Sequence, residues 1–486
     1  MNATDLGHAV QLSFIVGAAL FVIGLHLMNS PATARNGNRL SAAGMIIAVT
    51  AEIAFVSQGQ IGLGNWAIIV GGLALGGGAG LRLARTLQMT SMPQLVSLFN
   101  AVGGGAAGLL ALSDFLALDG QRVLAGGVPG LDGWRTFFIL ADILVGSVTF
   151  TGSLIATAKL MGILKGQPIL IPGGRILSWF TVVCGLSVSI VLILAGAGVV
   201  TYETQVLYAL LGVALVCALV FGVTMVLPIG GADMPVVISL LNAFTGTAVS
   251  MAGFVVNNVM LIVAGALVGA SGAILTRLMA NAMNRSIPNI LVGGFGGREG
   301  TQTELTAEGG TVREVSVDDA AIQLAYASKV VIVPGYGLAV AQAQHGVREL
   351  ADLLEARGIE VSYAIHPVAG RMPGHMNVLL AEANVPYPQL REMDDINPEF
   401  DRTDVALVIG ANDVTNPAAR TDRSSPIYGM PILDVDRAKS IIVVKRSMGR
   451  GYAGIDNPLY VNPKTGMFFA DAKAGIQQLI AAVKEV

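Results

Sequence analysis

The sequence predicts a polytopic α-helical membrane bundle of about nine transmembrane helices, followed by an α/β domain built on a parallel sheet. Three observations support this fold class. Charged residues are concentrated in the C-terminal part, long apolar runs fill the N-terminal part, and short β-branched strands alternate with helical segments near the C-terminus. They divide the chain into a membrane domain (1–290), a linker (291–318) and an α/β domain (319–486).

The density of charged residues differs between the two parts of the chain, as expected if the first part lies in the membrane and the second in water. Residues 1–290 contain 19 charged side chains, whereas the remaining 196 residues contain 42. Over the whole chain 53% of residues are apolar and 13% are charged, against about 25% charged in ordinary soluble domains. The net charges of +3 and −6 for the two parts add up to the overall −3, which excludes a basic nucleic-acid-binding protein.

Nine apolar stretches are each long enough to cross a hydrocarbon core about 30 Å thick. They lie near 9–28, 40–57, 64–84, 94–113, 136–158, 176–198, 205–227, 234–256 and 258–280. Basic residues are concentrated on one side of these spans, at Arg35, Arg39, Arg82, Arg85, Lys159, Lys165, Arg175, Arg277 and Arg285, against only Arg122 and Arg135 on the other. This bias predicts an N-terminus outside and a C-terminal domain in the cytoplasm.

A short repeat lies within the apolar region. Residues 92–101 (MPQLVSLFNA) and 234–243 (MPVVISLLNA) are identical at six of ten positions, and each copy opens a span with Pro in its first turn. Both spans run in the same direction, so Asn100 and Asn242 should reach a similar depth. Internal symmetry is common where a transport path forms between repeats, although two Pro-capped apolar helices can also resemble each other by chance.

Ionisable groups at membrane depth are costly and are therefore candidates for function. His26, Glu52 and Asp142 lie within the spans, and His26 and Glu52 could form a titratable pair. Asp142 could instead lie near an interface. Asp233 precedes the second MP helix, where a plain N-cap would also explain it.

The C-terminal domain opens with an apolar strand at 330–333 that runs into Gly335-Tyr336-Gly337 and then a helix to about Arg357. Gly-x-Gly between a strand and a helix is typical of dinucleotide-binding Rossmann-like domains, but Val340 occupies the place of the third glycine, so a bare βα turn is also possible. Further strands at 360–365, 405–409 and 441–444 end in loops at the same predicted sheet edge.

Two features of these loops favour NADP(H) over NAD(H). No acidic residue ends the second strand, where NAD-binding domains keep a ribose-binding carboxylate. Lys445 and Arg446 follow the fourth strand and could hold a 2′-phosphate, although a solvated Lys-Arg pair is the simpler alternative. We find no P-loop, no metal-ligand cluster and no Ser-His or Cys-His nucleophile set.

Together these motifs resemble the β subunit of the proton-translocating NAD(P)+ transhydrogenases over almost the whole chain. The most specific runs are 230–235 (GGADMP), 334–344 (PGYGLAVAQAQ), 366–377, 410–413 (GAND) and 445–454. The resemblance implies an oxidoreductase of the bacterial inner membrane that transfers hydride between NADH and NADP+ and couples this to inward proton movement. It also implies a partner α subunit that carries the NAD(H) domain and extra transmembrane helices, in a dimer of α–β units.

The resemblance also implies roles for individual residues. Residues of the first glycine loop would hold the NADP pyrophosphate, namely Gly335, Tyr336, Gly337 and Val340. Two further loops would line the site, through Val368, Ala369, Gly370, Arg371, Met372, Gly410, Ala411, Asn412 and Asp413. Lys445, Arg446 and Ser447 would bind the 2′-phosphate, and a lid would comprise Arg450, Gly451, Tyr452, Ala453 and Gly454. In the membrane, proton transfer and its coupling would involve Asp233, Asn242 and Ser271.

One departure affects the proton path. Many relatives carry a histidine where this chain has Asn100. We therefore expect the titrating role to lie elsewhere, with His26 or Glu52 as candidates and Asn100 and Asn242 holding water. A transporter gated by a nucleotide-sensing cytoplasmic domain is the alternative function. A passive membrane anchor for a dehydrogenase would leave the paired Asn motifs and Asp233 unexplained.

Overall fold

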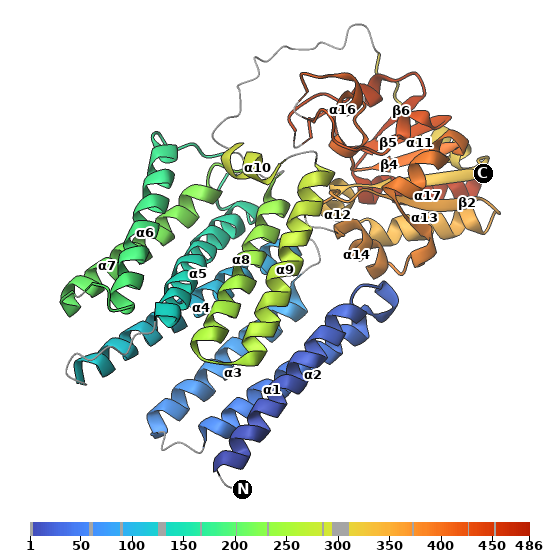
Figure 1. The fold of residues 1–486 in the computed structure, drawn as a ribbon. Helices are drawn as coiled ribbons and strands as arrows, with labels where there is room; N and C mark the ends of the chain where they lie inside the picture. The colour runs from blue at the N-terminus through green and yellow to red at the C-terminus, as the bar shows by residue number, and fades with distance from the viewer. Residues whose placement is uncertain are drawn as a thin grey trace. The chain divides into compact units, whose positions relative to one another are not determined.

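The structure is a computed structural model, and it divides into a helical unit and an α/β unit (Figure 1). It describes residues 3–57, 62–87, 91–124, 133–165, 168–200, 202–230, 233–283, 286–293, 311–371, 374–425, 427–451 and 453–486. The predicted fold class is confirmed, because apolar helices are followed by a parallel sheet covered by helices.

Within the described residues, nine helices are long and apolar enough to cross a membrane. They are α1 (Ala3–Leu27), α2 (Pro31–Val56), α3 (Leu63–Thr86), α4 (Met92–Leu124), α5 (Gly133–Leu160), α6 (Gly174–Gly196), α7 (Thr204–Val226), α8 (Met234–Val255) and α9 (Val259–Ala282). Each corresponds to one predicted span. The largest difference at a helix start is in α2, which begins nine residues before its apolar run because Pro31 stands at its N-terminal turn and its first turns are polar.

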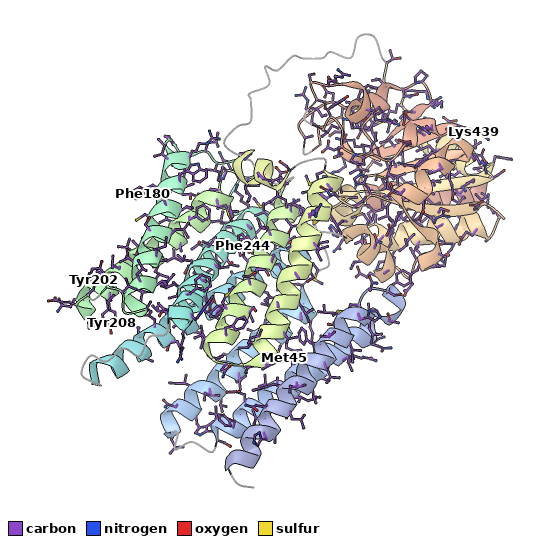
Figure 2. All side chains as sticks on the ribbon, viewed as in Figure 1. Met45, Phe180, Tyr202, Tyr208, Phe244 and Lys439 are labelled. Carbon is purple, nitrogen blue, oxygen red and sulfur yellow. The ribbon has the colours of Figure 1, made fainter. Side chains whose placement is uncertain are left out.

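Glycine allows these helices to pack closely in antiparallel pairs. In α4 and α5, a Cβ on Gly146 would lie 2.6 Å from the Gly104 carbonyl oxygen, and in α1 and α2 a Cβ on Gly44 would lie 2.9 Å from that of Gly17. Large apolar side chains such as Met45 and Phe180 are exposed on the outside of the unit, and Tyr202 and Tyr208 are exposed at the start of α7 (Figure 2). An apolar exterior with tyrosines near helix ends is typical of a lipid-facing surface.

The sequence repeat extends into a repeated helical hairpin. Ser97 in α4 donates to the Ser153 carbonyl of α5 at 2.9 Å, and its repeat partner Ser239 in α8 donates to the Gly272 carbonyl of α9 at 3.2 Å. Gly104 packs against Gly146, and Gly246 packs against Gly265. The α4–α5 and α8–α9 hairpins therefore use the same contacts.

The α/β unit contains six parallel strands in the order β3-β2-β1-β4-β5-β6. They are β1 (Lys329–Pro334), β2 (Glu360–Ile365), β3 (Leu390–Glu392), β4 (Val405–Ile409), β5 (Ser440–Lys445) and β6 (Thr465–Phe469). This is the strand order of doubly wound dinucleotide-binding domains, in which successive strands are added first on one side of β1 and then, from β4 onward, on the other. Residues 313–315, within the predicted linker, also belong here, because Val315 donates to the Met467 carbonyl at 3.0 Å.

Helices cover both faces of the sheet. One face is covered by α11 (Val317–Ala325), α12 (Tyr336–Ala341), α13 (Gln344–Glu355), α14 (His375–Glu382) and α17 (Ala472–Glu485). The other is covered by short helices that include α15 (Met393–Ile396), η3 (Asn397–Arg402), η5 (Val435–Arg437) and η6 (Pro458–Val461). The remaining short elements are α10 (Ile287–Gly293), η2 (Tyr387–Gln389), η4 (Asp413–Thr415) and α16 (Ala418–Thr421).

The helix expected after β1 is broken. α12 ends at Ala341, and α13 begins only at Gln344 because Gln342 adopts a left-handed conformation with φ of 50°. The break leaves a short, separate helix directly after the first glycine loop.

Candidate nucleotide site and intramembrane polar groups

A cavity lies at the carboxyl ends of the strands, between β1 and β4, where the strand order of the sheet reverses. Its walls are the loops that follow β1, β2, β4 and β5. Parallel α/β sheets bind ligands at this place, because two neighbouring loops turn away from each other there and leave a crevice.

Two of these loops touch through their backbones. A Cβ on Gly335 would lie 2.4 Å from the Ala411 Cα, and one on Gly337 would lie 2.7 Å from the Gly410 Cα. Gly335 and Gly337 donate their N–H groups to the carbonyls of Ile409 (2.9 Å) and Gly410 (3.0 Å). These glycines therefore lock the β1 loop onto the β4 loop, and their own N–H groups are already satisfied within the protein.

A cation next to the first loop suits a pyrophosphate. The Arg371 guanidinium lies 4.4 Å from the centroid of the Tyr336 ring. Gly370 lets the loop that carries Arg371 lie close to His375, because its φ of 107° is accessible mainly to glycine and a Cβ there would lie 2.4 Å from Nδ1 of His375.

Two buried histidines stabilise the loop after β2. Nδ1 of His366 accepts from the Val368 N–H at 3.2 Å and its Nε2 lies 2.8 Å from the Pro431 carbonyl, while Nδ1 of His375 accepts from the Arg371 N–H at 3.1 Å. Burial lowers the pKa of His366 to about 4, and burial followed by the Arg371 charge lowers that of His375. Both rings are therefore neutral at pH 7 and act as hydrogen-bonding supports.

Cations also follow β5. Lys445 donates to the Gly449 carbonyl at 2.5 Å and lies 4.5 Å from the centroid of the Tyr460 ring, and its burial lowers its pKa. Arg446 is exposed and forms no salt bridge with any residue that the structure describes. An unpaired guanidinium beside a half-buried ammonium is suited to bind a phosphate monoester.

The described residues on either side of position 452, 450–451 and 453–457, contact the loop after β4. Asp413 accepts the Ala453 N–H at 3.0 Å, and a Cβ on Gly451 would lie 2.4 Å from the Asp413 carboxylate. Arg450 pairs with Asp456 at 3.0 Å, and Asn457 donates to the Asn412 carbonyl at 3.1 Å. The Asp413 carboxylate therefore anchors the predicted lid, and the Asn457 amide anchors the residues that follow it.

The structure brings most of the predicted nucleotide-binding residues around this one cavity. Those lining it are Gly335, Tyr336, Gly337, Val340, Val368, Ala369, Gly370, Arg371, Gly410, Ala411, Asn412, Asp413, Lys445, Arg446, Ser447, Arg450, Gly451 and Ala453. Gly454 lies just beyond the lining, and Met372 and Tyr452 lie outside the described residues.

Sequence reasoning did not assign roles to several supporting residues, including His366, His375 and Asn457. Asn457 is buried and caps η6, because its side chain accepts the Leu459 N–H at 3.0 Å. The pair Asn457-Pro458 is a sequence signal for such a cap, since Asn favours the N-cap and Pro the first helical position. The histidine partners are backbone groups that no sequence pattern marks.

The two repeat asparagines differ in their surroundings. Asn100 is buried, its side-chain amide donates to the Ile238 carbonyl of α8 at 3.3 Å, and its backbone carbonyl accepts from the Thr245 hydroxyl at 3.3 Å. Asn242 is half-buried and forms no side-chain hydrogen bond with the part of the chain that the structure describes. The two asparagines therefore share a sequence register, but unlike the serines and glycines of the repeat they do not share contacts.

The remaining membrane candidates are dispersed. Asp233 lies in the turn before α8, and Ser271 is exposed on α9, where it donates to the Val268 carbonyl at 3.1 Å. In the sequence, Lys159 is notable only as a basic residue at the end of a span. In the structure it is buried and donates to the backbone carbonyls of Leu227 and Ile229, which follow α7.

His26 and Glu52 do not meet. Gly24 lies against Gly37 and Gly17 against Gly44, so α1 and α2 are antiparallel and the two side chains lie at opposite ends of this pair. At 1.5 Å per residue they are separated by about 25 Å along the helices. Both are exposed.

Among the described residues, no cluster of His, Cys, Asp and Glu has a geometry that would hold a metal ion. The charged side chains that line the cavity are four cations, Arg371, Lys445, Arg446 and Arg450, and three carboxylates, Asp233, Asp413 and Asp471, and the glycine backbones of the loops also face it. They fit a dinucleotide with an additional phosphate.

The apolar helices and the doubly wound parallel sheet together define a class of protein, a multi-pass membrane protein with a dinucleotide-binding type of domain. Comparison with known proteins makes the assignment specific. The chain belongs to the NAD(P) transhydrogenase beta subunit family, which matches residues 10–482. Members of this family are subunits of proton-translocating oxidoreductases.

Two relatives, from Rhodospirillum rubrum and from one strain of that species, are NAD(P) transhydrogenase beta subunits. Each is 46% identical to this chain over 478 residues, which cover 98% of this chain and 99% of the relative. The predicted family is thus confirmed.

Proposed function

We propose that the α/β unit of this chain binds NADP(H), and that hydride from NADH on a partner α subunit is transferred to it while protons move inward through the helical unit. The observation that carries this proposal is the pair of cations after β5. Lys445 and Arg446 adjoin the cavity, whereas β2 ends at Ile365 and His366 without a ribose-binding carboxylate.

The residues of this chain would divide the work of binding. Arg371 would neutralise the pyrophosphate, and Lys445 with Arg446 and Ser447 would bind the 2′-phosphate. The bound nicotinamide supplies the hydride acceptor. The lid from Arg450 to Gly454, anchored by Asp413, would retain the nucleotide and exclude water from it.

We assign proton transfer and coupling to Asp233, Asn242, Asn100 and Ser271. Lys159 would hold the carbonyls of Leu227 and Ile229 after α7 in place. Residues 1–290 would form the translocating domain, and the nucleotide domain would begin at residue 313, inside the linker 291–318 that the sequence predicts.

The N-terminus would lie outside and the C-terminus in the cytoplasm, with α–β units paired as a dimer in the bacterial inner membrane.

Equilibrium binding to the purified chain tests the nucleotide assignment. NADPH should bind about 100-fold more tightly than NADH, because two charge-assisted hydrogen bonds to a phosphate are worth about 1.5–3 kcal/mol each before the cost of ordering the loop. Equal affinities for NADPH and NADH would contradict the proposal.

A further inference from the structure

The helical unit contains one buried acid that the roles above do not use. Asp142 in α5 is fully buried, and neither of its carboxylate oxygens has a hydrogen-bond partner among the described residues. An ionised carboxylate in such a place costs several kcal/mol, so the resting group must be protonated.

Contacts on either side place Asp142 at the junction of three helices. Phe138, one turn earlier, stacks on Phe254 of α8 at 4.6 Å, and Val145, one turn later, packs against Ala107 of α4 and Ala252 of α8. These positions share one face of α5 with Asp142. The acid therefore lies where α4, α5 and α8 meet.

Asn100 lies at the same junction at a different depth. Ser97 is level with Ser153 and Gly104 is level with Gly146, which fixes the register of α4 against α5. Each residue precedes its glycine by four positions. Because α4 and α5 are antiparallel, Asn100 and Asp142 therefore lie on opposite sides of the level at which Gly104 meets Gly146. At 1.5 Å per residue, the two side chains are about 12 Å apart along the bundle.

Neighbouring charges do not account for the acid. The closest charged pair on α4 and α5 is Asp114 with Arg135, whose atoms lie 2.9 Å apart and satisfy each other. The α8 sequence has no charged residue. Packing does not require an acid either, because the repeated hairpin has Leu261 at the equivalent position of α9.

We propose that Asp142 is the carboxylic acid that carries the translocated proton through the junction of α4, α5 and α8. Its O–H bond breaks as the proton passes to water on the Asn100 side, and a new O–H bond forms with a proton taken up from water on the opposite side. The carboxyl group is neutral again after each cycle, and no electrons are exchanged. The assignment rests on the proposed proton-coupled function, and it replaces His26 and Glu52, which are exposed, as candidates.

The test uses the complete enzyme with its α subunit, reconstituted in vesicles with a pH-sensitive dye inside. D142N should reduce proton movement during hydride transfer by roughly 10²-fold, the low end of acid–base contributions. D142E should restore most of it, since it keeps the titratable group. NADPH binding should be unchanged in both variants, which shows that the protein is folded.

The matched control is D114N, the same substitution at an ion-paired acid on the adjacent helix, which should keep proton movement within about twofold, because an exposed ion pair contributes little. An infrared difference spectrum provides a second readout, because a protonated Asp142 should give a carboxylic C=O band that D142N lacks. Wild-type enzyme that transfers hydride without moving protons would overturn the proposed function. Wild-type enzyme that pumps, together with D142N that pumps equally well, would overturn only the role of Asp142.

Discussion

Replacing Arg446 by alanine should weaken binding of NADP(H) and leave binding of NAD(H) unchanged. Arg446 is the cleaner probe of the two cations, because Lys445 also donates to the Gly449 carbonyl and packs on Tyr460, so its removal would disturb the base of the lid. Arg446 has no ion pair among the described residues, so its loss breaks no internal contact.

The magnitude follows from its exposure. A hydrogen bond between charged groups is worth about 1.5–3 kcal/mol, and solvent screening at an exposed side chain favours the lower value. About 1.5 kcal/mol corresponds to roughly tenfold in the dissociation constant.

Calorimetric titration of the purified protein with NADPH and with NADH measures the effect directly. Arg402→Ala is the matched control, since Arg402 is exposed at the opposite, amino end of β4. If Arg446→Ala leaves NADPH affinity unchanged, or weakens NADH binding equally, the assignment of the 2′-phosphate site is wrong.

Three further predictions concern the same unit. Gly410→Ala should destabilise it by about 1–3 kcal/mol in thermal unfolding, because Gly410 has φ of 66° and a Cβ would lie 2.4 Å from the Gly337 Cα. Gly358→Ala is its control, with φ of 83° and open space around it, so a cost as large there would refute the role of loop contact. Asp413→Asn should weaken lid closure by about 1–2 kcal/mol, seen as faster hydrogen exchange at Ala453 and faster NADPH release; unchanged exchange would argue against the anchor. The pKa of His366 falls from 6.5 to about 4 on folding, so its contribution to the free energy of unfolding should be fully present above pH 6.5 and should fall by about 3 kcal/mol as the pH drops to 4. His366→Gln should lessen this pH dependence, measured by urea titrations at several pH values. An unaltered dependence in the variant would contradict the role of His366.

Much of this fold can be predicted from the sequence. Nine apolar runs are confirmed as nine helices within the described residues, because the length of a span and the scarcity of charge are local properties. Four of the six strands are predicted by their apolar runs. β3 and β6 are missed because β3 is three residues long and partly polar, and β6 contains Thr465 and Gly466, which weaken its apolar pattern.

Sequence reasoning predicts the loops of the candidate site better than the contacts between them. The residues at strand ends converge because carboxyl ends of parallel strands share one edge. That the Gly335 and Gly337 N–H groups bond within the protein could not be predicted, since their acceptors, Ile409 and Gly410, lie 74 and 73 residues further along the chain. For the same reason, a predicted His26–Glu52 pair fails: the register of α1 against α2 is fixed by glycine contacts that hydropathy does not show.

The most direct test of the account is the coupling of the two units in one assay. With the complete enzyme in sealed vesicles, an imposed proton gradient should accelerate the formation of NADPH from NADH and NADP+, and an uncoupler should abolish that acceleration. A rate of hydride transfer that does not respond to the gradient would contradict the central claim that proton movement through the helical unit drives chemistry at the NADP(H) site.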